Sequence, residues 1–363
     1  MRLKLGSVVK IASLAALLAV AAPFVGTAIG SPDANPADRP SAPVSSILPR
    51  PGSLGADASP RDHALARLNA VVDAEKQLPL QSGTQTRAYI QPGQAKGTIV
   101  MYHGFTAGTW QFELLARKVY AAGFNVYVPR LPGHGFHDAN GREDPRQLLT
   151  ARNWRDYETF ADSTFEDVTG LGAPISVIGL SVGGAVALRA AELHDDIVRV
   201  VAYAPFMQAH GAAKLGLSFE HLLDVLTFGV AGNTLSLVPG GWGKAVELQT
   251  ASGERPGHAI FNLGTIYAAT LLGREILANA SHLKAPVQFF TTAIDHAADE
   301  TTIRELYKRI GGPARQGWYQ YPASEKVPHP MIHPYEDGGA GQTPALYEMT
   351  LRFLETGQMI NRP

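Results

Sequence analysis

A serine between two glycines stands where a predicted strand meets a predicted helix. The stretch reads Gly179-Leu-Ser181-Val182-Gly183. The run 175–178 before it is rich in β-branched residues, and the Ala- and Leu-rich segment after it has helical spacing, which predicts a strand, a sharp turn and a helix. We expect Ser181 at the turn with its Oγ pointing outward, because Gly179 and Gly183 leave room where a Cβ would clash. The Val182 N–H would then face an oxyanion.

A serine hydroxyl is a weak nucleophile at neutral pH and needs a histidine base, which a carboxylate orients. Two aspartates follow the apolar run 286–292. Asp295 stands three residues past this run, where a carboxylate still reaches the edge of a sheet, and we expect it to be the acid. Asp299 adjoins the next predicted helix, whose N-terminal dipole it would face. It is the alternative acid.

The histidine base is expected in the loop after the following strand, because nucleophile, acid and histidine follow one another in this order when the serine lies on such a turn. The loop at 322–342 contains two late histidines. His329 lies nearer to the preceding strand and leaves the rest of the loop to reach the final helix, so we favour it. His333 is the alternative base.

A second oxyanion donor is expected after the apolar run 97–102, which ends in His103-Gly104-Phe105. Gly104 permits a close approach of the backbone, and Phe105 would present its N–H beside that of Val182. We expect His103 to orient this loop by hydrogen bonding and not to act as a base. The expected reaction is acyl transfer to water: the serine attacks an ester carbonyl, an acyl-enzyme forms, and histidine activates the water that releases the acid.

The elements that carry these residues alternate between strands and helices. The runs 97–102 and 125–129 predict strands on either side of a helix at 110–122, which makes a parallel pair with a right-handed crossover. A helix at 151–167 leads to the strand of the nucleophile, and 198–203 predicts another strand. We therefore expect an α/β protein with a doubly wound, mostly parallel sheet. All the candidate residues would lie at the carboxyl ends of its strands.

The chain divides into four predicted parts. Residues 1–30 contain basic positions, an apolar run and small residues, which is typical of an export signal to the periplasm or exterior. An uncleaved membrane anchor is the alternative. Residues 31–62, rich in Pro and Ser, predict a disordered linker before one domain at 63–363. The alternation breaks at about 206–284, an insertion that we expect to form a helical cap and to line an apolar pocket.

Composition excludes several classes of function. With 363 residues, 45% of them hydrophobic, and a net charge of −1, the chain can bury a large core but offers no basic field to nucleic acid. It has no cysteine, which excludes a thiol nucleophile, thiolate ligands and disulfides. His134, His137 and Asp138 share a glycine-broken loop, but no predicted helix or hairpin holds them in register for a metal. We expect no metal and no cofactor.

Together these motifs resemble the α/β-hydrolase superfamily. The resemblance rests on His103-Gly-Phe-Thr-Ala-Gly108, Leu131-Pro-Gly-His-Gly135, Gly179-Leu-Ser-Val-Gly-Gly184, Asp295 and His329. Over about residues 96–357 the chain most resembles the monoacylglycerol lipase, lysophospholipase and carboxylesterase branch. The resemblance implies about eight strands, a helical cap, no cofactor, and hydrolysis of carboxylic esters that bear an acyl chain. The loop at 322–342 is longer than usual in this branch, and the predicted export signal differs from its cytosolic members.

The sequence is compatible with three functions. The first is a serine esterase or lipase that acts on a small acyl ester or a lipid, with contact to a lipid surface through the cap. The second uses the same fold on a thioester, an amide or a polyester, which differ from an ester only in the pocket they require. The third is a binding protein on an inactive hydrolase scaffold. Such a protein would lack a member of the triad, and the sequence lacks none.

Overall fold

The computed structural model describes residues 46–362, except 53, 56, 173, 211–255, 259–260, 262 and 311–315. The predicted export signal and most of the predicted cap lie outside the described residues. Across the described ranges, we find no helix with the length and apolar character needed to cross a membrane.

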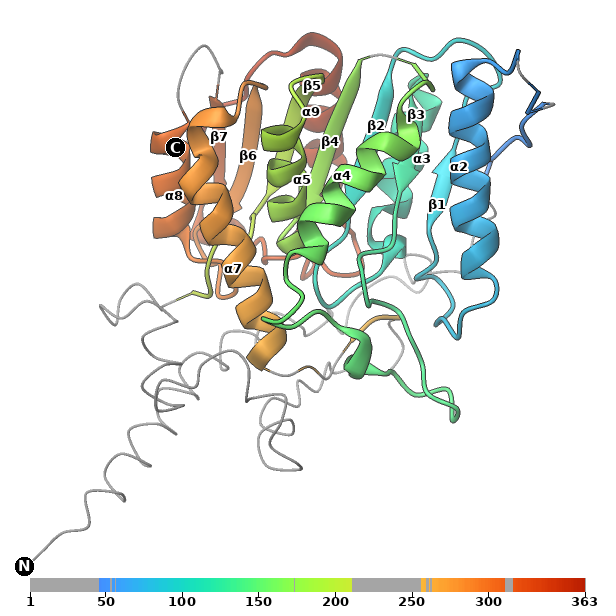
Figure 1. Cartoon of the computed structure of the whole chain (residues 1–363). Coiled ribbons are helices and arrows are strands. Elements are labelled where there is room, and N and C mark those ends of the chain that lie inside the picture. The colour runs from blue at the N-terminus through green and yellow to red at the C-terminus, as the bar shows by residue number, and fades with distance from the viewer. Residues whose placement is uncertain are drawn as a thin grey trace, which may run out of the picture.

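One sheet of seven strands runs through the described part of the chain (Figure 1). The strands are β1 (Arg87–Tyr89), β2 (Thr98–Tyr102), β3 (Asn125–Val128), β4 (Ile175–Leu180), β5 (Ile197–Tyr203), β6 (Val287–Thr292) and β7 (Gln316–Tyr321). Their order across the sheet is β1-β3-β2-β4-β5-β6-β7, and β1 alone of these seven runs antiparallel to its neighbour. This is the mostly parallel, doubly wound sheet that the sequence predicts, with seven described strands where about eight were expected.

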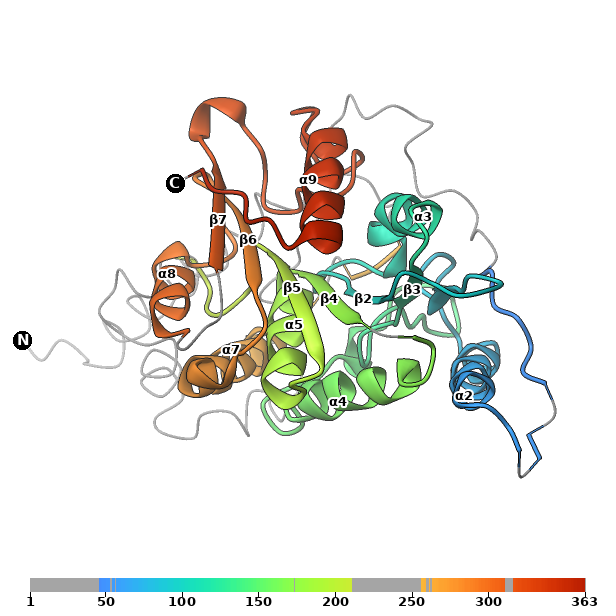
Figure 2. The ribbon, with the colours of Figure 1, turned by 90° about the horizontal axis from the view of Figure 1, so that it is seen from above.

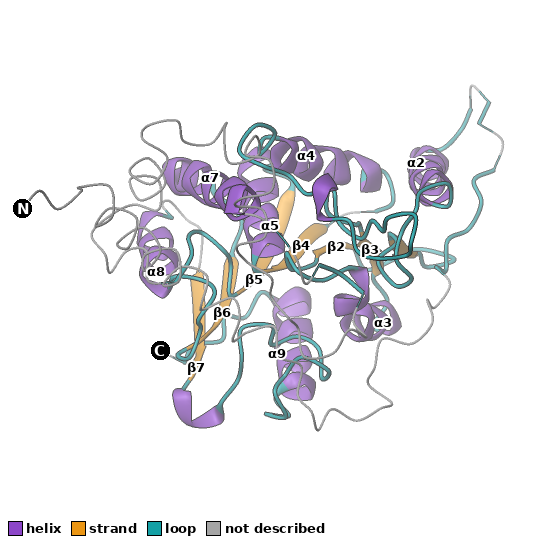
Figure 3. Ribbon diagram, turned by 90° about the horizontal axis from the view of Figure 1, so that it is seen from below, coloured by secondary structure: helices purple, strands orange, loops and turns teal. Residues whose placement is uncertain are grey.

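Helices cover both faces of the sheet (Figures 2 and 3). One face carries α2 (Pro60–Glu75), α4 (Asp156–Val168), α5 (Val182–Leu193), α7 (Leu263–Asn279) and α8 (Glu300–Arg309). The other face carries α3 (Glu113–Ala121) and α9 (Thr343–Thr356). Short 3₁₀ helices are η2 (Thr109–Phe112), η3 (Pro145–Gln147), η5 (Ala280–His282) and η6 (Ala323–Glu325).

The core lies in two layers because side chains of a strand alternate between the faces of the sheet. In β2, Val100 and Tyr102 pack in the layer of α5, whereas Ile99 and Met101 pack in the layer of α3. Both sets are buried, so the strand reads as a continuous apolar run, as expected for a parallel sheet covered on both faces.

The carboxyl ends of the parallel strands meet at one edge. Tyr102 is in register with Gly179, Leu180 with Tyr203, and Thr292 with Tyr321. The loops that follow β2, β4, β6 and β7 therefore leave the sheet at the same edge, where ligands of such sheets bind.

The end of the predicted linker is ordered against the edge strand. Ile47 forms a bridge with Tyr89 of β1, and the Ile90 N–H donates to Ile47 O at 2.8 Å. The Ala88 N–H donates to Ser46 Oγ at 3.2 Å. Residues 46 and 47 of the predicted linker therefore pair with the backbone of β1 and the residue after it. An edge strand leaves unpaired backbone groups, and an extended segment can satisfy them.

Helix α7 is the long described helix in the part of the chain for which a cap was predicted. It falls within the range 206–284, but it packs against α5 and α8 in the helical layer on that face of the sheet. This part of the range is an element of the α/β domain. Residues 211–255, where most of the cap was expected, lie outside the described residues.

Candidate active site

Ser181 lies in the tight turn between β4 and α5. Its backbone has φ 57° and ψ −120°, a conformation that is strained for a residue with a side chain. The Ser181 N–H donates to Tyr203 O at 2.9 Å, and Ser181 O accepts from the Phe206 N–H at 2.9 Å. Two bonds to the end of β5 and the chain just beyond it therefore hold the turn in place.

The glycines around Ser181 leave the space that this turn needs. A Cβ on Gly179 would lie 2.0 Å from Gly183 O, and a Cβ on Gly183 would lie 2.1 Å from Tyr102 O. Both distances are shorter than any non-bonded contact allows, so only glycine fits at either position.

Asp295 and His329, the predicted acid and base, are hydrogen-bonded to each other. Asp295 follows β6, and His329 lies in the loop after η6. The His329 Nδ1 is 2.8 Å from Asp295 Oδ2. The other carboxylate oxygen, Oδ1, accepts from the N–H groups of Ala297 and Ala298, both at 2.8 Å. Both side chains are buried, so the carboxylate is held on one side by backbone donors and on the other by the imidazole.

The alternative acid, Asp299, has a different partner. Its Oδ1 accepts from the N–H and from the hydroxyl of Thr302, both at 2.9 Å. Asp299 is thus the N-cap of α8, the position at which an aspartate stabilises a helix through the unpaired N–H groups of the first turn. The structure does not place it against either late histidine by hydrogen bonding.

The alternative base, His333, is engaged elsewhere in the same loop. Its Nδ1 accepts from the Tyr335 N–H at 3.1 Å, and its ring packs edge-on against Trp110 at 5.3 Å between centroids. Asp295 bonds to His329 and not to His333.

The predicted oxyanion loop is held by His103. The Leu131 N–H donates to His103 Nε2 at 3.0 Å, and His103 Nδ1 is 2.8 Å from Gly104 O. Burial lowers the pKa of His103 well below its usual value, so the ring is neutral. Because Nε2 accepts, the single N–H is on Nδ1 and donates to Gly104 O. Neither the Phe105 N–H nor the Val182 N–H donates to an acceptor within the described part of the chain.

Two further buried histidines lie behind this loop. His134 Nε2 is 2.7 Å from Phe105 O, and its ring packs edge-on against His103 and His258 at 5.3 and 5.6 Å. His258 Nε2 accepts from the Gly135 N–H at 3.1 Å. Burial lowers the pKa of His134 to about 4 and that of His258 to about 3. The sequence gives no sign of this cluster beyond the glycine-broken loop that holds His134.

The other residues considered as metal ligands make local contacts. His137 Nδ1 is 2.8 Å from Asp138 O, and Asp138 Oδ1 accepts from the N–H groups of Asn140 and Arg142. Among the residues that the structure describes, no three His, Cys, Asp or Glu side chains form a group that could hold a metal ion.

Ser181 shares the carboxyl edge of the sheet with the acid and histidine pair. Its strand, β4, is separated from β6 by β5 alone. In the described part of the chain, no hydrogen bond joins Ser181 Oγ to His329 Nε2. Catalytic hydrogen bonds of a free enzyme are often long and tighten in the substrate complex.

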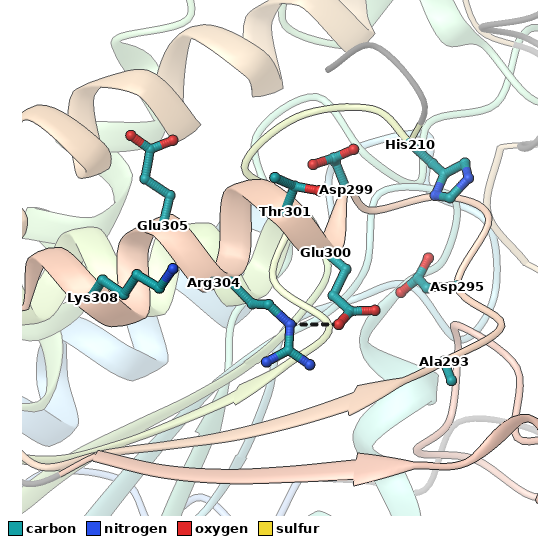
Figure 4. Close-up of a pocket in the computed structure, with 9 residues that line it drawn as sticks. All are labelled: His210, Ala293, Asp295, Asp299, Glu300, Thr301, Arg304, Glu305 and Lys308. Carbon is teal, nitrogen blue, oxygen red and sulfur yellow. Dashed lines mark hydrogen bonds and ion pairs between the residues drawn. The ribbon is translucent and has the colours of Figure 1, made fainter. Parts of the chain in front are cut away.

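A polar cavity of about 510 Å³ lies beside the acid loop (Figure 4). It is lined by His210, Ala293, Asp295, Asp299, Glu300, Thr301, Arg304, Glu305 and Lys308. Glu300 and Arg304, one turn apart on α8, form an ion pair at 2.6 Å in its lining. Four carboxylates and two cations line this cavity, so it does not resemble the apolar pocket that an acyl chain requires.

The parallel sheet and the strained serine between β4 and α5 define the class of α/β-hydrolases. A family model described as Serine aminopeptidase, S33 matches residues 93–320, which is more than half of the chain. The chain therefore belongs to this family.

Several known proteins are similar to the chain. A thermostable monoacylglycerol lipase of Bacillus sp. (strain H-257) is 31% identical over 126 residues, which are 35% of this chain and 46% of that protein. The match thus spans about half the length of this relative. The solved monoacylglycerol lipase of Paleococcus ferrophilus is 20% identical with a TM-score of 0.53, covering 75% of this chain and 98% of that one. A soluble variant of the Saccharomyces cerevisiae monoglyceride lipase is 14% identical with a TM-score of 0.52, covering 76% and 92%. These two structures share the fold.

Proposed function

We propose that the protein is a serine hydrolase that cleaves carboxylic esters of acyl chains through an acyl-enzyme on Ser181. The observation that carries this proposal is the buried hydrogen bond between Asp295 and His329, on the sheet edge where the strained turn presents Ser181. Nucleophile, base and acid on three loops of one edge are the components that acyl transfer requires.

In the proposed reaction, His329 Nε2 removes the proton of Ser181 Oγ as the oxygen attacks the ester carbonyl. The Asp295 carboxylate keeps the proton of His329 on Nδ1 and stabilises the imidazolium that forms. The N–H groups of Phe105 and Val182 stabilise the oxyanion. The imidazolium then protonates the leaving alcohol, and the same histidine activates the water that hydrolyses the acyl-enzyme.

The surroundings of the nucleophile support an acyl substrate. The Phe206 N–H donates to Ser181 O, and the Phe206 side chain is buried with Met207 in the same core cluster. Phe105 packs edge-on against Phe261 at 5.1 Å. The described side chains beside the turn of the nucleophile are therefore apolar. The relatives named for monoacylglycerol lipase activity favour an ester over the thioester, amide or polyester that the same triad could cleave.

We further propose that the protein is exported and that its cap contacts the surface of a lipid substrate. The basic and apolar N-terminal stretch and the apolar residues of 206–284 support this proposal. Fractionation of cells that express the full chain checks it, since an exported protein leaves the cytosolic fraction. Retention of all the protein in the cytosol would contradict it.

Labelling with a fluorophosphonate tests the nucleophile. The probe reacts with an activated serine, so the wild-type chain should be labelled and Ser181→Ala should not. Ser163→Ala is the matched control, because Ser163 is an exposed serine on α4 whose hydroxyl bonds to Phe160 O of the same helix. Full labelling of Ser181→Ala would place the nucleophile elsewhere.

A comparison of His329→Ala with His333→Ala tests the base. Loss of the base should lower kcat about 10⁴-fold or more, as for other triad residues. His333→Ala should retain a kcat within about tenfold of wild type, because His333 does not bond to Asp295. Equal losses in the two variants would refute the assignment of His329.

The substrate class is tested with p-nitrophenyl esters of increasing acyl length beside a monoacylglycerol. An apolar pocket adds about 0.8 kcal/mol per buried methylene, so kcat/KM should rise with chain length until the pocket is filled. A preference for acetate over all longer chains would contradict an acyl-chain pocket. Faster cleavage of matched thioesters or amides would favour the second class of substrate.

A further inference from the structure

Three hydrogen bonds hold the peptide groups on either side of Gly104. The Gly104 N–H donates to Gln111 Oε1 at 2.7 Å. Gly104 O accepts from His103 Nδ1 at 2.8 Å and from the Ala107 N–H at 3.2 Å. The carbonyl of Gly104 and the N–H of Phe105 belong to one planar trans peptide and point in opposite directions. The orientation of the Gly104 carbonyl therefore fixes the direction of the Phe105 N–H.

Gln111 is itself held by a carboxylate from a distant loop. Gln111 Nε2 donates to Glu336 Oε2 at 2.6 Å, across 225 positions of sequence. Gln111 is 2% exposed and Glu336 is 5% exposed. The Gly104 N–H can only donate and a carboxylate can only accept, so the two partners fix which end of the Gln111 amide faces which. A charged acceptor in a buried setting strengthens such a bond.

Glu336 belongs to the loop that carries the proposed base. It lies seven positions after His329, and its N–H donates to His333 O at 2.8 Å. Trp110, the neighbour of Gln111, packs edge-on against Tyr335 at 6.4 Å. Contacts at two adjacent points thus join the loop of the base to the loop of the oxyanion donor.

We infer that Gln111 and Glu336 are positioning residues of the oxyanion hole, which aim the Phe105 N–H at the developing oxyanion before substrate binds. This inference rests on the proposed function, because it takes Phe105 as an oxyanion donor. Neither residue needs to touch the ester. Loss of either one removes the hold on the Gly104 N–H and loosens the backbone on that side of Gly104, which weakens stabilisation of the transition state and leaves ground-state binding intact.

The variant Gln111→Met tests the inference, because methionine has a similar length and makes neither hydrogen bond. Loss of a whole oxyanion donor costs about 10²- to 10³-fold in kcat, so we expect a loss of about 30-fold here with KM changed less than about twofold. A trifluoromethyl ketone with the same acyl chain forms a tetrahedral adduct with the serine. Its Ki should rise by about the factor by which kcat/KM falls. The endpoint of fluorophosphonate labelling counts the active sites in each preparation.

Variants of Glu336 provide an independent test. Glu336→Gln keeps an acceptor for Gln111 Nε2 and should retain kcat within about fivefold, whereas Glu336→Leu should match Gln111→Met. The double variant of Gln111→Met and Glu336→Leu should be no worse than either single variant, because both changes break the same chain of contacts. If Gln111→Met does not accumulate as folded protein, the comparison of the two Glu336 variants decides.

Gln288→Met is the matched control. Gln288 is fully buried in β6, where its Nε2 donates to Phe289 O and Ile360 O, away from the oxyanion loop. The variant Gln288→Met should lower Tm without changing kcat per labelled site. Unchanged kcat and Ki in Gln111→Met and Glu336→Leu would overturn the inference if Ser181→Ala is inactive. An active Ser181→Ala would instead overturn the proposed function.

Discussion

At the scale of the residue, the site depends on one strained backbone conformation. Ser181 has a positive φ although it carries a side chain, and the bonds to Tyr203 and Phe206 hold it there. Strain of this kind persists only where the surroundings determine the conformation. The glycines at 179 and 183 allow these surroundings to form. Because they have no Cβ atom, the start of α5 can lie close to β2 and β4.

Gly179→Ala should therefore destabilise the protein. The added Cβ would lie 2.0 Å from Gly183 O, a backbone atom that cannot move without displacing α5. Overpacking of this kind costs about 3 kcal/mol or more. Gly93→Ala is the control, because no atom lies within 4 Å of its added Cβ. Thermal unfolding of both variants measures the difference, and equal Tm values would contradict this account of the turn.

At the scale of the element, the start of α8 lies beside two aspartates with different hydrogen-bond partners. Asp295 precedes the helix and accepts from two N–H groups of the loop while it holds His329. Asp299 caps the helix through Thr302. The loop between them is tied to the chain after β5, because the Asp299 N–H donates to Gln208 O at 2.9 Å. The same short segment thus carries the proposed catalytic acid and the cap of the helix.

The variants Asp295→Ala and Asp299→Ala should affect different measurements. Asp299→Ala removes a cap, which costs about 1 kcal/mol of stability and should leave kcat within about threefold of wild type. Asp295→Ala removes the proposed acid of the triad, so kcat should fall by about 10⁴-fold. Unfolding curves and steady-state kinetics on the same preparations distinguish the two. A large loss of kcat in Asp299→Ala alone would identify it as the acid.

At the scale of the whole molecule, buried neutral histidines make stability depend on pH. Burial lowers the pKa of His134 to about 4 and that of His258 to about 3, whereas unfolded histidine titrates near about 6.5. Below about pH 6.5 the unfolded chain therefore binds more protons than the folded chain. The contribution of these histidines to the free energy of unfolding is therefore complete above this pH, and it decreases as the pH is lowered toward 4.

We expect Tm to fall between about pH 7 and pH 4.5, and His258→Gln to reduce this fall. Glutamine at 258 offers an acceptor to the Gly135 N–H but does not titrate in this range. The exposed His63 gives the control variant His63→Gln, which should keep the wild-type dependence. Thermal unfolding across the pH range checks the prediction. The same slope in both variants would exclude His258 as a source.

The sequence by itself determined the order of strands and helices, the turn at Ser181 and the candidates for acid and base, because these follow from local residue types and spacing. The turn rests on residues within a few positions of one another, such as the glycines at 179 and 183, and the acid and base candidates rest on their order along the chain after predicted strands. The pairing of Asp295 with His329, the capping by Asp299, and the contact of Gln111 with Glu336 were decided by the tertiary structure. These contacts join loops from different strands, and only the register of the sheet brings such loops together at one edge.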